Sequence, residues 1–230
     1  MSGAIVQSHC GVTLLGGGEV TANAVTKALT IAPMLVAADG GADVALGFGL
    51  LPDAVIGDFD SISEAARRAI PANRQHPIPE QDTTDFDKCL RNIAAPFVVA
   101  VGFTGARIDH ALAVFNTLVR HSHRRCVILG PQDVCFVCSP VLTLDLPPGT
   151  RLSLFPMGRV RGTSDGLRWP IAGLDFAPDA RVGTSNEAVG GPVQLSFDAA
   201  AMLVILPADF LDAAIAALCP PAAQPAVPGK

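Results

Sequence analysis

The feature that most constrains this chain's fold is a regular alternation of short apolar runs with helical patterns over the first 130 residues. The runs expected to form strands lie at residues 12–15, 34–38, 54–56, 97–101 and 126–129. The segments expected to form helices lie between them, at residues 21–31, 63–70, 84–93 and 109–121. Apolar strands that alternate with helices predict a mostly parallel sheet with helices on both faces. We therefore predict an α/β domain over residues 1–131.

The pattern changes near residue 131. Short runs then follow one another between turn signals, at residues 147–149, 164–166 and 190–192, and a helical pattern returns at residues 208–218. Many short runs between turns are typical of an all-β sandwich or barrel. We therefore predict a β-sandwich domain over residues 132–218. Residues 219–230 carry four prolines and no periodicity, so we expect a disordered tail there.

Net charge and apolar run length narrow the class of partner. The formal net charge is -5, whereas binding to a nucleic-acid backbone needs clustered Lys and Arg. The longest apolar runs are about ten residues, well short of the roughly 20 that span a membrane. The first residues have neither the basic nor the apolar part of a signal peptide. These observations predict a cytoplasmic protein that binds neither nucleic acid nor membrane.

The six cysteines are scattered along the chain, which favours small buried side chains in a reducing compartment. Cys135 and Cys138 have the C-x-x-C spacing of redox and zinc motifs. However, they lie in an apolar run, and residues three apart in a strand point to opposite faces. The sequence has no second cysteine pair at zinc spacing and no helix start after this one. Core packing is therefore the favoured interpretation of both residues.

Carboxylates stand at the ends of successive predicted strands: Asp39, Asp58, Asp60 and Asp109. Ligands of open α/β sheets bind in the crevice outside the carboxyl ends of the strands. In an extended segment Asp58 and Asp60 point to the same side, and Mg²⁺ binds such carboxylates together with substrate phosphate. Each Asp alone also suits a turn or a helix N-cap, and for Asp109 both interpretations stay open. Four carboxylates at successive strand ends favour a metal site.

A second polar cluster lies at residues 81–88. Asp85 and Lys88 are three residues apart and share one face of the predicted helix. One interpretation is an ion pair on the surface, worth well under ~1 kcal/mol. The functional interpretation puts Asp85 on the metal ion and Lys88 near phosphate, which makes both of them candidate catalytic residues.

A glycine-rich loop, residues 102–108, connects a predicted strand to a predicted helix. Gly102 and Gly105 allow the backbone to present N–H groups and a helix N-terminus to an anion. Arg107 adds a guanidinium that binds phosphate oxygens in pairs. The loop lacks the G-x-x-x-x-G-K-[ST] pattern of a Walker A motif, so it indicates another kind of phosphate site. The glycine run at residues 16–18 is a weaker signal, since any strand-to-helix turn could use it.

Together these motifs resemble those of the thiamine pyrophosphokinase family. The resemblance rests on short segments in the same order and at similar spacing, at residues 38–42, 51–53, 57–61, 81–88, 105–110, 164–169 and 184–186. It covers about residues 10 to 207. The sequence departs from the family pattern at Ile108, where an aromatic residue is usual, and at Gly183, where a small hydroxyl residue is often found.

The resemblance implies an α/β domain that binds ATP, a β-sandwich domain that binds thiamine, and a homodimer. It implies that Asp58, Asp60 and Asp85 hold Mg²⁺, with Asp39 and Asp109 close by. It further implies contacts to substrate from six residues: Asp39, Gln81, Trp169, Thr184, Ser185 and Asn186. The site residues of the two domains must meet, either within one chain or across a dimer whose chains share the active site, and the resemblance favours the dimer.

The reaction implied by the resemblance is an attack of the thiamine hydroxyl on the β-phosphorus of ATP, giving thiamine diphosphate and AMP. Arg107 or Lys88 would neutralise charge, and a carboxylate, with Asp85 and Asp109 as candidates, would accept the hydroxyl proton. Trp169 would stack on a ring of thiamine, with core packing as its alternative role. Two other functions stay open: a related phosphotransferase acting on another alcohol, and a non-catalytic sensor of nucleotide or thiamine.

Overall fold

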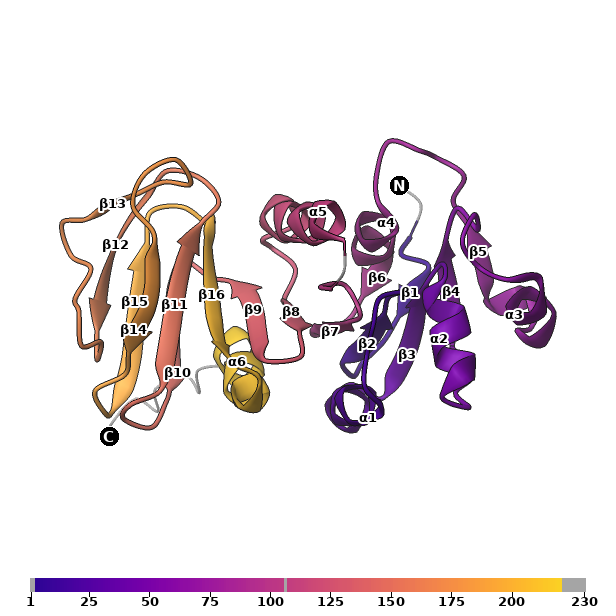
Figure 1. Ribbon diagram of the computed structural model, residues 1–230, viewed down its shortest axis with the longest axis horizontal. Coiled ribbons are helices and arrows are strands. Elements are labelled where there is room, and N and C mark those ends of the chain that lie inside the picture. The colour runs from indigo at the N-terminus through magenta and orange to yellow at the C-terminus, as the bar shows by residue number, and fades with distance from the viewer. Residues whose placement is uncertain (1–2, 106, 221–230) are drawn as a thin grey trace, which may run out of the picture.

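The first half of the chain folds around a parallel sheet. A computed structural model describes residues 3–105 and 107–220. The parallel strands are, in spatial order, β8 (Cys126–Leu129), β7 (Val98–Val101), β2 (Val12–Leu15), β3 (Met34–Ala38), β4 (Ala54–Gly57) and β5 (Gln75–Pro77) (Figure 1). Most of their apolar side chains are buried, which confirms the parallel sheet that the sequence pattern predicts.

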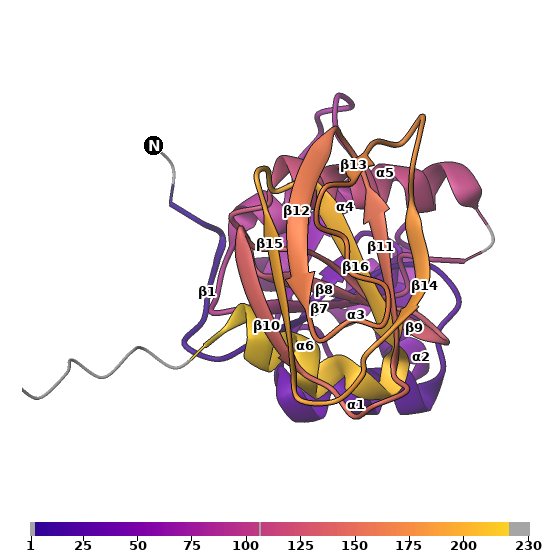
Figure 2. The same ribbon diagram turned by 90° about the vertical axis from the view of Figure 1, so that its left-hand side faces the viewer.

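Helices pack on both faces of this sheet, as Figure 2 shows. One face carries α1 (Ala22–Ile31), α2 (Gly41–Gly47) and the C-terminal α6 (Leu211–Leu218), and the other carries α4 (Asp85–Asn92) and α5 (Ile108–Arg120). The short α3 (Glu64–Ala69) packs beside α2. Three predicted helix starts are confirmed, because Thr21, Ser63 and Thr84 accept first-turn backbone N–H bonds with their hydroxyls. No helix of the described residues has the length and apolar character needed to cross a bilayer.

Several small elements are absent from the prediction. The helix α2 is seven residues long and starts at a glycine without a side-chain cap, so the usual signals of a helix start are missing. The others are the edge strand β5, the parallel pair β1 (Val6–Gln7) and β6 (Ile93–Ala94), and the 3-10 turn η1 (Ala72–Arg74). Elements this short leave little periodicity in a sequence.

The second half of the chain is an antiparallel sandwich, as predicted. Its first sheet contains β9 (Asp133–Val137), β16 (Met202–Pro207), β11 (Arg151–Pro156) and β14 (Gly183–Glu187). Its second sheet contains β10 (Val141–Asp145), β15 (Pro192–Phe197), β12 (Val160–Asp165) and β13 (Asp175–Phe176). Along β10 and β15 exposed and buried residues alternate, because one face packs on the other sheet and one faces solvent.

One sheet of seven strands, in the order β14-β11-β16-β9-β8-β7-β2, runs through both halves. Its pairing changes from parallel to antiparallel between β8 and β9. The helix α6 follows the 3-10 turn η2 (Ala208–Phe210) and packs against β8, β9 and β10, so it contacts both halves. Hydrogen-bonded strands, and not a linker alone, therefore join the two halves.

Four of the six cysteines follow the core interpretation, whereas Cys10 is exposed and Cys219 is half-buried. Cys89, Cys126, Cys135 and Cys138 are buried free thiols. Cys135 and Cys138 belong to different hydrophobic clusters on opposite faces of the sheet, which confirms their predicted core packing. Cys10 is exposed, because it lies in a turn closed by a hydrogen bond from Ser8 Oγ to the Cys10 carbonyl oxygen at 2.9 Å. The predicted tail falls almost wholly on residues 221–230, outside the described residues.

Candidate active site

A cavity of about 750 Å³ lies at the carboxyl ends of the parallel strands. Four of these strands are followed by segments that line it: residues 16–19 after β2, 38–44 after β3, 58–63 after β4, and 102–105 with 107 after β7. The first turns of α4 and α5 complete the wall. The carboxyl ends of neighbouring parallel strands meet at one edge of a sheet, so the cavity lies where ligands of open α/β sheets bind.

Three carboxylates converge beside this cavity. Oxygen atoms of Asp39, Asp58 and Asp60 lie within 4.8 Å of one another, and in the described part of the chain this is the group of His, Cys, Asp or Glu side chains spaced to hold a metal ion. A set of carboxylate oxygens fits Mg²⁺, which takes oxygen ligands and completes its shell with water and phosphate. The sequence prediction has Asp85 as the third ligand, whereas in the structure Asp39 joins the group.

Two turns in the backbone bring these carboxylates together. Asp39 has a φ of 41° and Phe59 a φ of 66°, a left-handed conformation that non-glycine residues rarely adopt. The turn at Phe59 allows the Asp60 N–H to donate to Asp58 Oδ1 at 3.3 Å. The expectation of an extended segment at residues 58–60 is therefore wrong. Such conformations cost about 1–3 kcal/mol each and gather at ligand sites.

Asp39 is the deepest of the three carboxylates, with 2% of its surface exposed. It accepts backbone N–H bonds from Ser61 at 3.1 Å and Ile62 at 3.0 Å. Burial raises the pKa of Asp39 to about 6, although these backbone bonds act in the opposite direction. A cation beside the carboxylate would offset the cost of burying its charge, so Asp39 suits a metal site better than contact with an uncharged group.

Lys88 links Asp58 to Asp85. Its ammonium donates to Asp58 Oδ2 at 2.7 Å and to Asp85 Oδ1 at 3.1 Å. Only 1% of Lys88 is exposed, so the interpretation as a surface ion pair is wrong. Burial alone would lower the pKa of Lys88, but its bonds to the two carboxylates outweigh burial and raise it. Gln81, predicted to contact substrate, donates to Asp58 Oδ2 at 3.2 Å.

Two glycine loops form the floor of the cavity. Gly102 has a φ of 80°, and its carbonyl oxygen accepts the N–H of Gly18 at 3.0 Å. A Cβ on Gly16 or Gly18 would lie 2.6 or 2.7 Å from that oxygen, so neither position has room for a side chain. The glycine run at residues 16–18 thus lines the cavity, although it is the weaker of the two sequence signals. The glycine run follows a strand and lies at the same sheet edge as Asp39, and this position is the signal that could have identified the run as part of the site.

Arg107 and Asp109 pair with each other at the rim. Arg107 Nη2 donates to Asp109 Oδ2 at 2.7 Å, and each side chain is 66% exposed. This hydrogen bond lowers the pKa of Asp109. Asp109 lies in the first turn of α5, whose N-cap residue is Arg107, so it is not the N-cap. His110 and Arg107 line the cavity, and sequence analysis did not single out His110.

The candidate residues of the second half are Trp169, in the loop after β12, and three neighbours on β14. The Trp169 ring is 53% exposed, so the core interpretation of this residue is wrong, and the Arg168 guanidinium lies 5.0 Å from the ring centre. Asn186 is buried, and its amide group bonds the Trp169 backbone in both directions, at 3.2 and 2.8 Å. Thr184 and Ser185 are exposed on β14, and Ser185 has a φ of 60°. Asn186 therefore holds the Trp169 backbone in place.

Gly183 explains one departure from the family pattern. A Cβ at this position would lie 3.1 Å from Leu154 Cβ and 3.3 Å from the ring of Phe176. Both contacts are tight, so a larger residue would need its neighbours to move. Ile108, the other departure, is 74% exposed at the start of α5.

The two sets of candidate residues do not meet within one chain. Every described residue that lines the large cavity lies between Gly16 and Val114. Figure 1 shows β12, β13 and β14 at one end of the molecule and β3, β4 and α2 at the other. A ligand in the cavity of a single chain therefore contacts the first half alone in the part that the structure describes.

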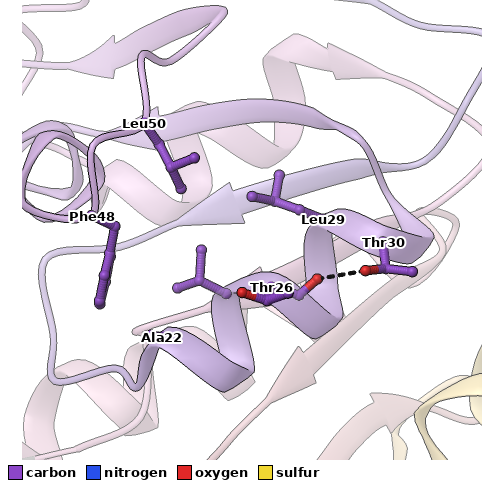
Figure 3. Close-up of a pocket in the computed structure, with 7 residues that line it drawn as sticks. Ala22, Thr26, Leu29, Thr30, Phe48 and Leu50 are labelled. Atoms are coloured by element: carbon purple, nitrogen blue, oxygen red, sulfur yellow. Dashed lines mark hydrogen bonds between the residues drawn. The ribbon is translucent and has the colours of Figure 1, made fainter.

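A second cavity, of about 420 Å³, lies between α1 and the segment after α2 (Figure 3). Its lining is apolar apart from Thr26 and Thr30, and Thr30 Oγ1 donates to the Thr26 carbonyl oxygen at 2.9 Å. It has no titratable side chain, so it offers nothing that could bind a metal ion or neutralise a phosphate.

Family models match both halves of the chain. The model described as "Thiamin pyrophosphokinase, catalytic domain" matches residues 25–129, and the one described as "Thiamin pyrophosphokinase, vitamin B1 binding domain" matches residues 142–202. Their boundary falls between the parallel and antiparallel halves. Most residues that line the large cavity lie in the first match, the glycine run at residues 16–18 lies just before it, and Trp169 lies in the second match.

Curated relatives and solved structures point to the same family. Thiamine pyrophosphokinase 1 of Oryza sativa subsp. japonica is 26% identical over 166 residues, which are 64% of this chain and 63% of that protein. Thiamine pyrophosphokinase 1 of Arabidopsis thaliana is 27% identical over 154 residues, 59% of this chain and 58% of that protein. The chain thus spans less than two thirds of the length of these relatives.

The fold of solved thiamin pyrophosphokinases covers nearly the whole chain. The structure from Candida albicans superposes with a TM-score of 0.72 at 14% identity and covers 90% of this chain and 95% of its own. The structure from Geobacillus thermodenitrificans has a TM-score of 0.70 at 23% identity and covers 86% and 96%. At these identities the likeness concerns the fold.

Proposed function

Because the chain belongs to the thiamine pyrophosphokinase family, we propose that it transfers a pyrophosphoryl group from ATP to the hydroxyl of thiamine. The products are thiamine diphosphate and AMP. The observation that carries this proposal is a cavity lined by carboxylates and glycines in the half that matches the catalytic domain. The exposed Trp169 in the half that matches the vitamin B1 binding domain supports it further.

The cavity suits the triphosphate of ATP together with a metal ion. Its glycine loops have no side chains to keep phosphate away, and Arg107 at the rim supplies a positive charge. Asp39, Asp58 and Asp60 would hold Mg²⁺, with Asp85 beside them. When bound there, Mg²⁺ would neutralise charge on the phosphates.

Transfer requires the thiamine oxygen to form a bond to the β-phosphorus while the bond from that phosphorus to the bridging oxygen of AMP breaks. The hydroxyl proton passes to a carboxylate. Asp85 is the better of the two candidates, because it lines the cavity and burial raises its pKa. Asp109 is a weaker base, because Arg107 lowers its pKa and donates a hydrogen bond to its carboxylate at the rim of the cavity.

Thiamine binds to the second half, and its cationic ring stacks on the Trp169 ring. The proposed active unit is a homodimer in which the cavity of one chain faces the Trp169 region of its partner. The separation of the two sets of residues within one chain supports this arrangement. Exposed apolar side chains next to the cavity, Ile108 at 74% and Leu112 at 60%, offer surface for the contact.

The remaining parts of the proposal concern domains and location. Residues 1–131 form the ATP-binding and catalytic domain and residues 132–218 the thiamine-binding domain, in line with the change from parallel to antiparallel pairing. The protein is proposed to work in the cytoplasm, which its free cysteines support.

The test is to incubate the purified protein with ATP, Mg²⁺ and thiamine and to identify the products by mass. Thiamine diphosphate and AMP in equal amounts are expected. Thiamine monophosphate with ADP, or a product from another alcohol in a panel, would contradict the proposed reaction and favour a related phosphotransferase. Binding of both substrates without any AMP would indicate a sensor.

A further inference from the structure

Lys88 is closed off from the cavity by its own ion-pair partners. Asp58 and Asp85 line the cavity, and Lys88 is not among the lining residues. The side-chain exposures are 11% for Asp58, 30% for Asp85 and 1% for Lys88. Two of the three ammonium protons are donated to these carboxylates. A phosphate in the cavity would meet the carboxylates before it met the ammonium.

The same bonds fix the orientation of Asp58. Its Oδ2 accepts from Lys88 at 2.7 Å and from Gln81 at 3.2 Å. Its Oδ1 accepts the Asp60 backbone N–H at 3.3 Å, and Asp58 is one of the three carboxylates, with Asp39 and Asp60, that are spaced to hold a metal ion. A carboxylate held at one oxygen cannot rotate freely, so the other oxygen keeps a constant direction.

Lys88 is itself held by the start of α4. Thr84 caps this helix, and the Lys88 N–H donates to the Thr84 carbonyl oxygen at 2.9 Å in its first turn. The ammonium therefore bridges the first turn of α4 to the loop after β4. It is also the buried cation among four neighbouring carboxylates, Asp39, Asp58, Asp60 and Asp85.

We infer that Lys88 is a positioning residue of the metal site: it orients Asp58 toward the metal ion and does not bind phosphate. The inference rests on the metal site of the proposed function and differs from the sequence-based prediction of Lys88 as a phosphate ligand. Removal of Lys88 has opposite effects on metal binding depending on whether Lys88 acts through its charge alone or by positioning Asp58. By charge alone, removal of Lys88 leaves the site more negative and strengthens cation binding. Loss of positioning frees Asp58 and weakens cation binding.

The experiment compares the full-length wild type with Lys88→Met, which keeps an unbranched apolar stem without the ammonium. Affinity for Mn²⁺, used as a probe for Mg²⁺ in the absence of nucleotide, is measured by calorimetry. We expect roughly 10- to 100-fold weaker binding, as for loss of other groups that orient metal ligands. Affinity for ATP in the presence of EDTA should stay within about two-fold, since the ammonium does not touch phosphate.

Arg91→Met is the matched control, because Arg91 lies on the same helix in a more exposed ion pair with Glu80. It should bind Mn²⁺ as the wild type does. Lys88→Arg replaces Lys88→Met if the latter does not fold, since it keeps the charge but puts a larger, planar guanidinium where the buried ammonium lies and so displaces Asp58, and we expect the same loss of Mn²⁺ affinity.

Unchanged or tighter Mn²⁺ binding by the Lys88 variant would overturn the inference, and so would ATP binding in EDTA weakened by about ten-fold or more. Wild-type protein that binds no Mn²⁺ would overturn the metal site of the proposed function and the inference with it. The wild-type measurement thus separates failure of the proposed function from failure of the role of Lys88.

Discussion

In the parallel half of the molecule the innermost candidate charges, Asp39 and Lys88, are buried and hydrogen-bonded, whereas in the antiparallel half Trp169, Thr184 and Ser185 face solvent. Asp39 is 2% exposed and Lys88 is 1% exposed, and both have partners within the same chain. Trp169 is 53% exposed, and Thr184 and Ser185 are open on β14. The polar group that is buried near them, the Asn186 amide, holds the Trp169 backbone.

The difference shows that each half supplies one kind of interaction. Burying a carboxylate costs free energy unless a cation balances its charge, so the parallel half is suited to ionic interactions. The antiparallel half instead presents an exposed aromatic ring on a fixed backbone, which suits contact with a molecule from outside this half. The two halves are therefore complementary.

The largest effect is expected from the carboxylates. Asp58→Asn and Asp60→Asn should each fold and lose at least ~10²-fold in turnover, because a neutral amide is a poor ligand for Mg²⁺. Asp145→Asn, on an exposed edge position of β10, is the control and should keep full activity. Steady-state rates of AMP release measure the effect. Near wild-type turnover in both site variants would remove these residues from the metal site.

The next prediction tests whether the two halves meet across a dimer. Asp58→Asn is co-expressed with the double variant Trp169→Ala/Asn186→Ala, which loses both the ring and the amide that holds its backbone. Activity is assayed at thiamine well below the wild-type KM, where each variant alone should be nearly inactive. If sites form between chains, random pairing places both lesions in one site of each mixed dimer and leaves the other intact, so roughly a quarter of wild-type activity returns.

The control for this rescue pairs two lesions of the same half. Co-expression of Asp58→Asn with Asp60→Asn leaves a lesion in every site, and no activity should return. Mixed dimers are demonstrated with two affinity tags. Absence of rescue in the first pair, with mixed dimers present, would confine the active site to one chain.

Trp169 should have a smaller effect, limited to one substrate. Trp169→Ala removes a ring that contributes about 0.5–2 kcal/mol to binding of a cation, so the KM for thiamine should rise roughly 2- to 30-fold. The KM for ATP should not change, because the ring lies outside the ATP cavity. Trp169→Phe is the control and should lie between wild type and Trp169→Ala. An equal rise in both KM values would mean that the variant disturbs the whole site.

The same contrast explains how far sequence alone could predict the structure. Parallel strands were predictable from uninterrupted apolar runs, and their topology brings Asp39, Asp58 and the Gly102 loop to one edge. The grouping of Asp39 with Asp58 and Asp60 was not foreseen. It depends on left-handed turns at Asp39 and Phe59, which are not evident from a sequence without glycine at these positions, and the predicted ligand Asp85 is joined to Asp58 through Lys88.

Two further features could not be read from the sequence. The spacing of Asp85 and Lys88 indicates a shared helix face, but burial of that face depends on how α4 packs. The change of pattern near residue 131 indicates a new architecture. It does not reveal that β9 pairs with β8 and extends the same sheet, because pairing between strands is a tertiary choice.

The smallest effect on activity is expected at the junction of the halves, where Cys135 and Cys138 pack on opposite faces of the shared sheet. The double variant Cys135→Ala/Cys138→Ala should lose about 1–3 kcal/mol of unfolding free energy, through lost packing. Its kcat and KM per folded molecule should match wild type.

Burial raises the pKa of both thiols to about 12, so thiol reagents should modify the exposed Cys10 first and reach these two on unfolding. Cys10→Ser should abolish the fast modification and leave stability unchanged.

Because β9 bonds to strands of both halves, denaturant should unfold the Cys135→Ala/Cys138→Ala variant in one transition, at a lower denaturant concentration than the wild type. Stoichiometric zinc in the wild-type protein, or loss of activity at full folding, would show that these cysteines serve a site and not the core that joins the halves.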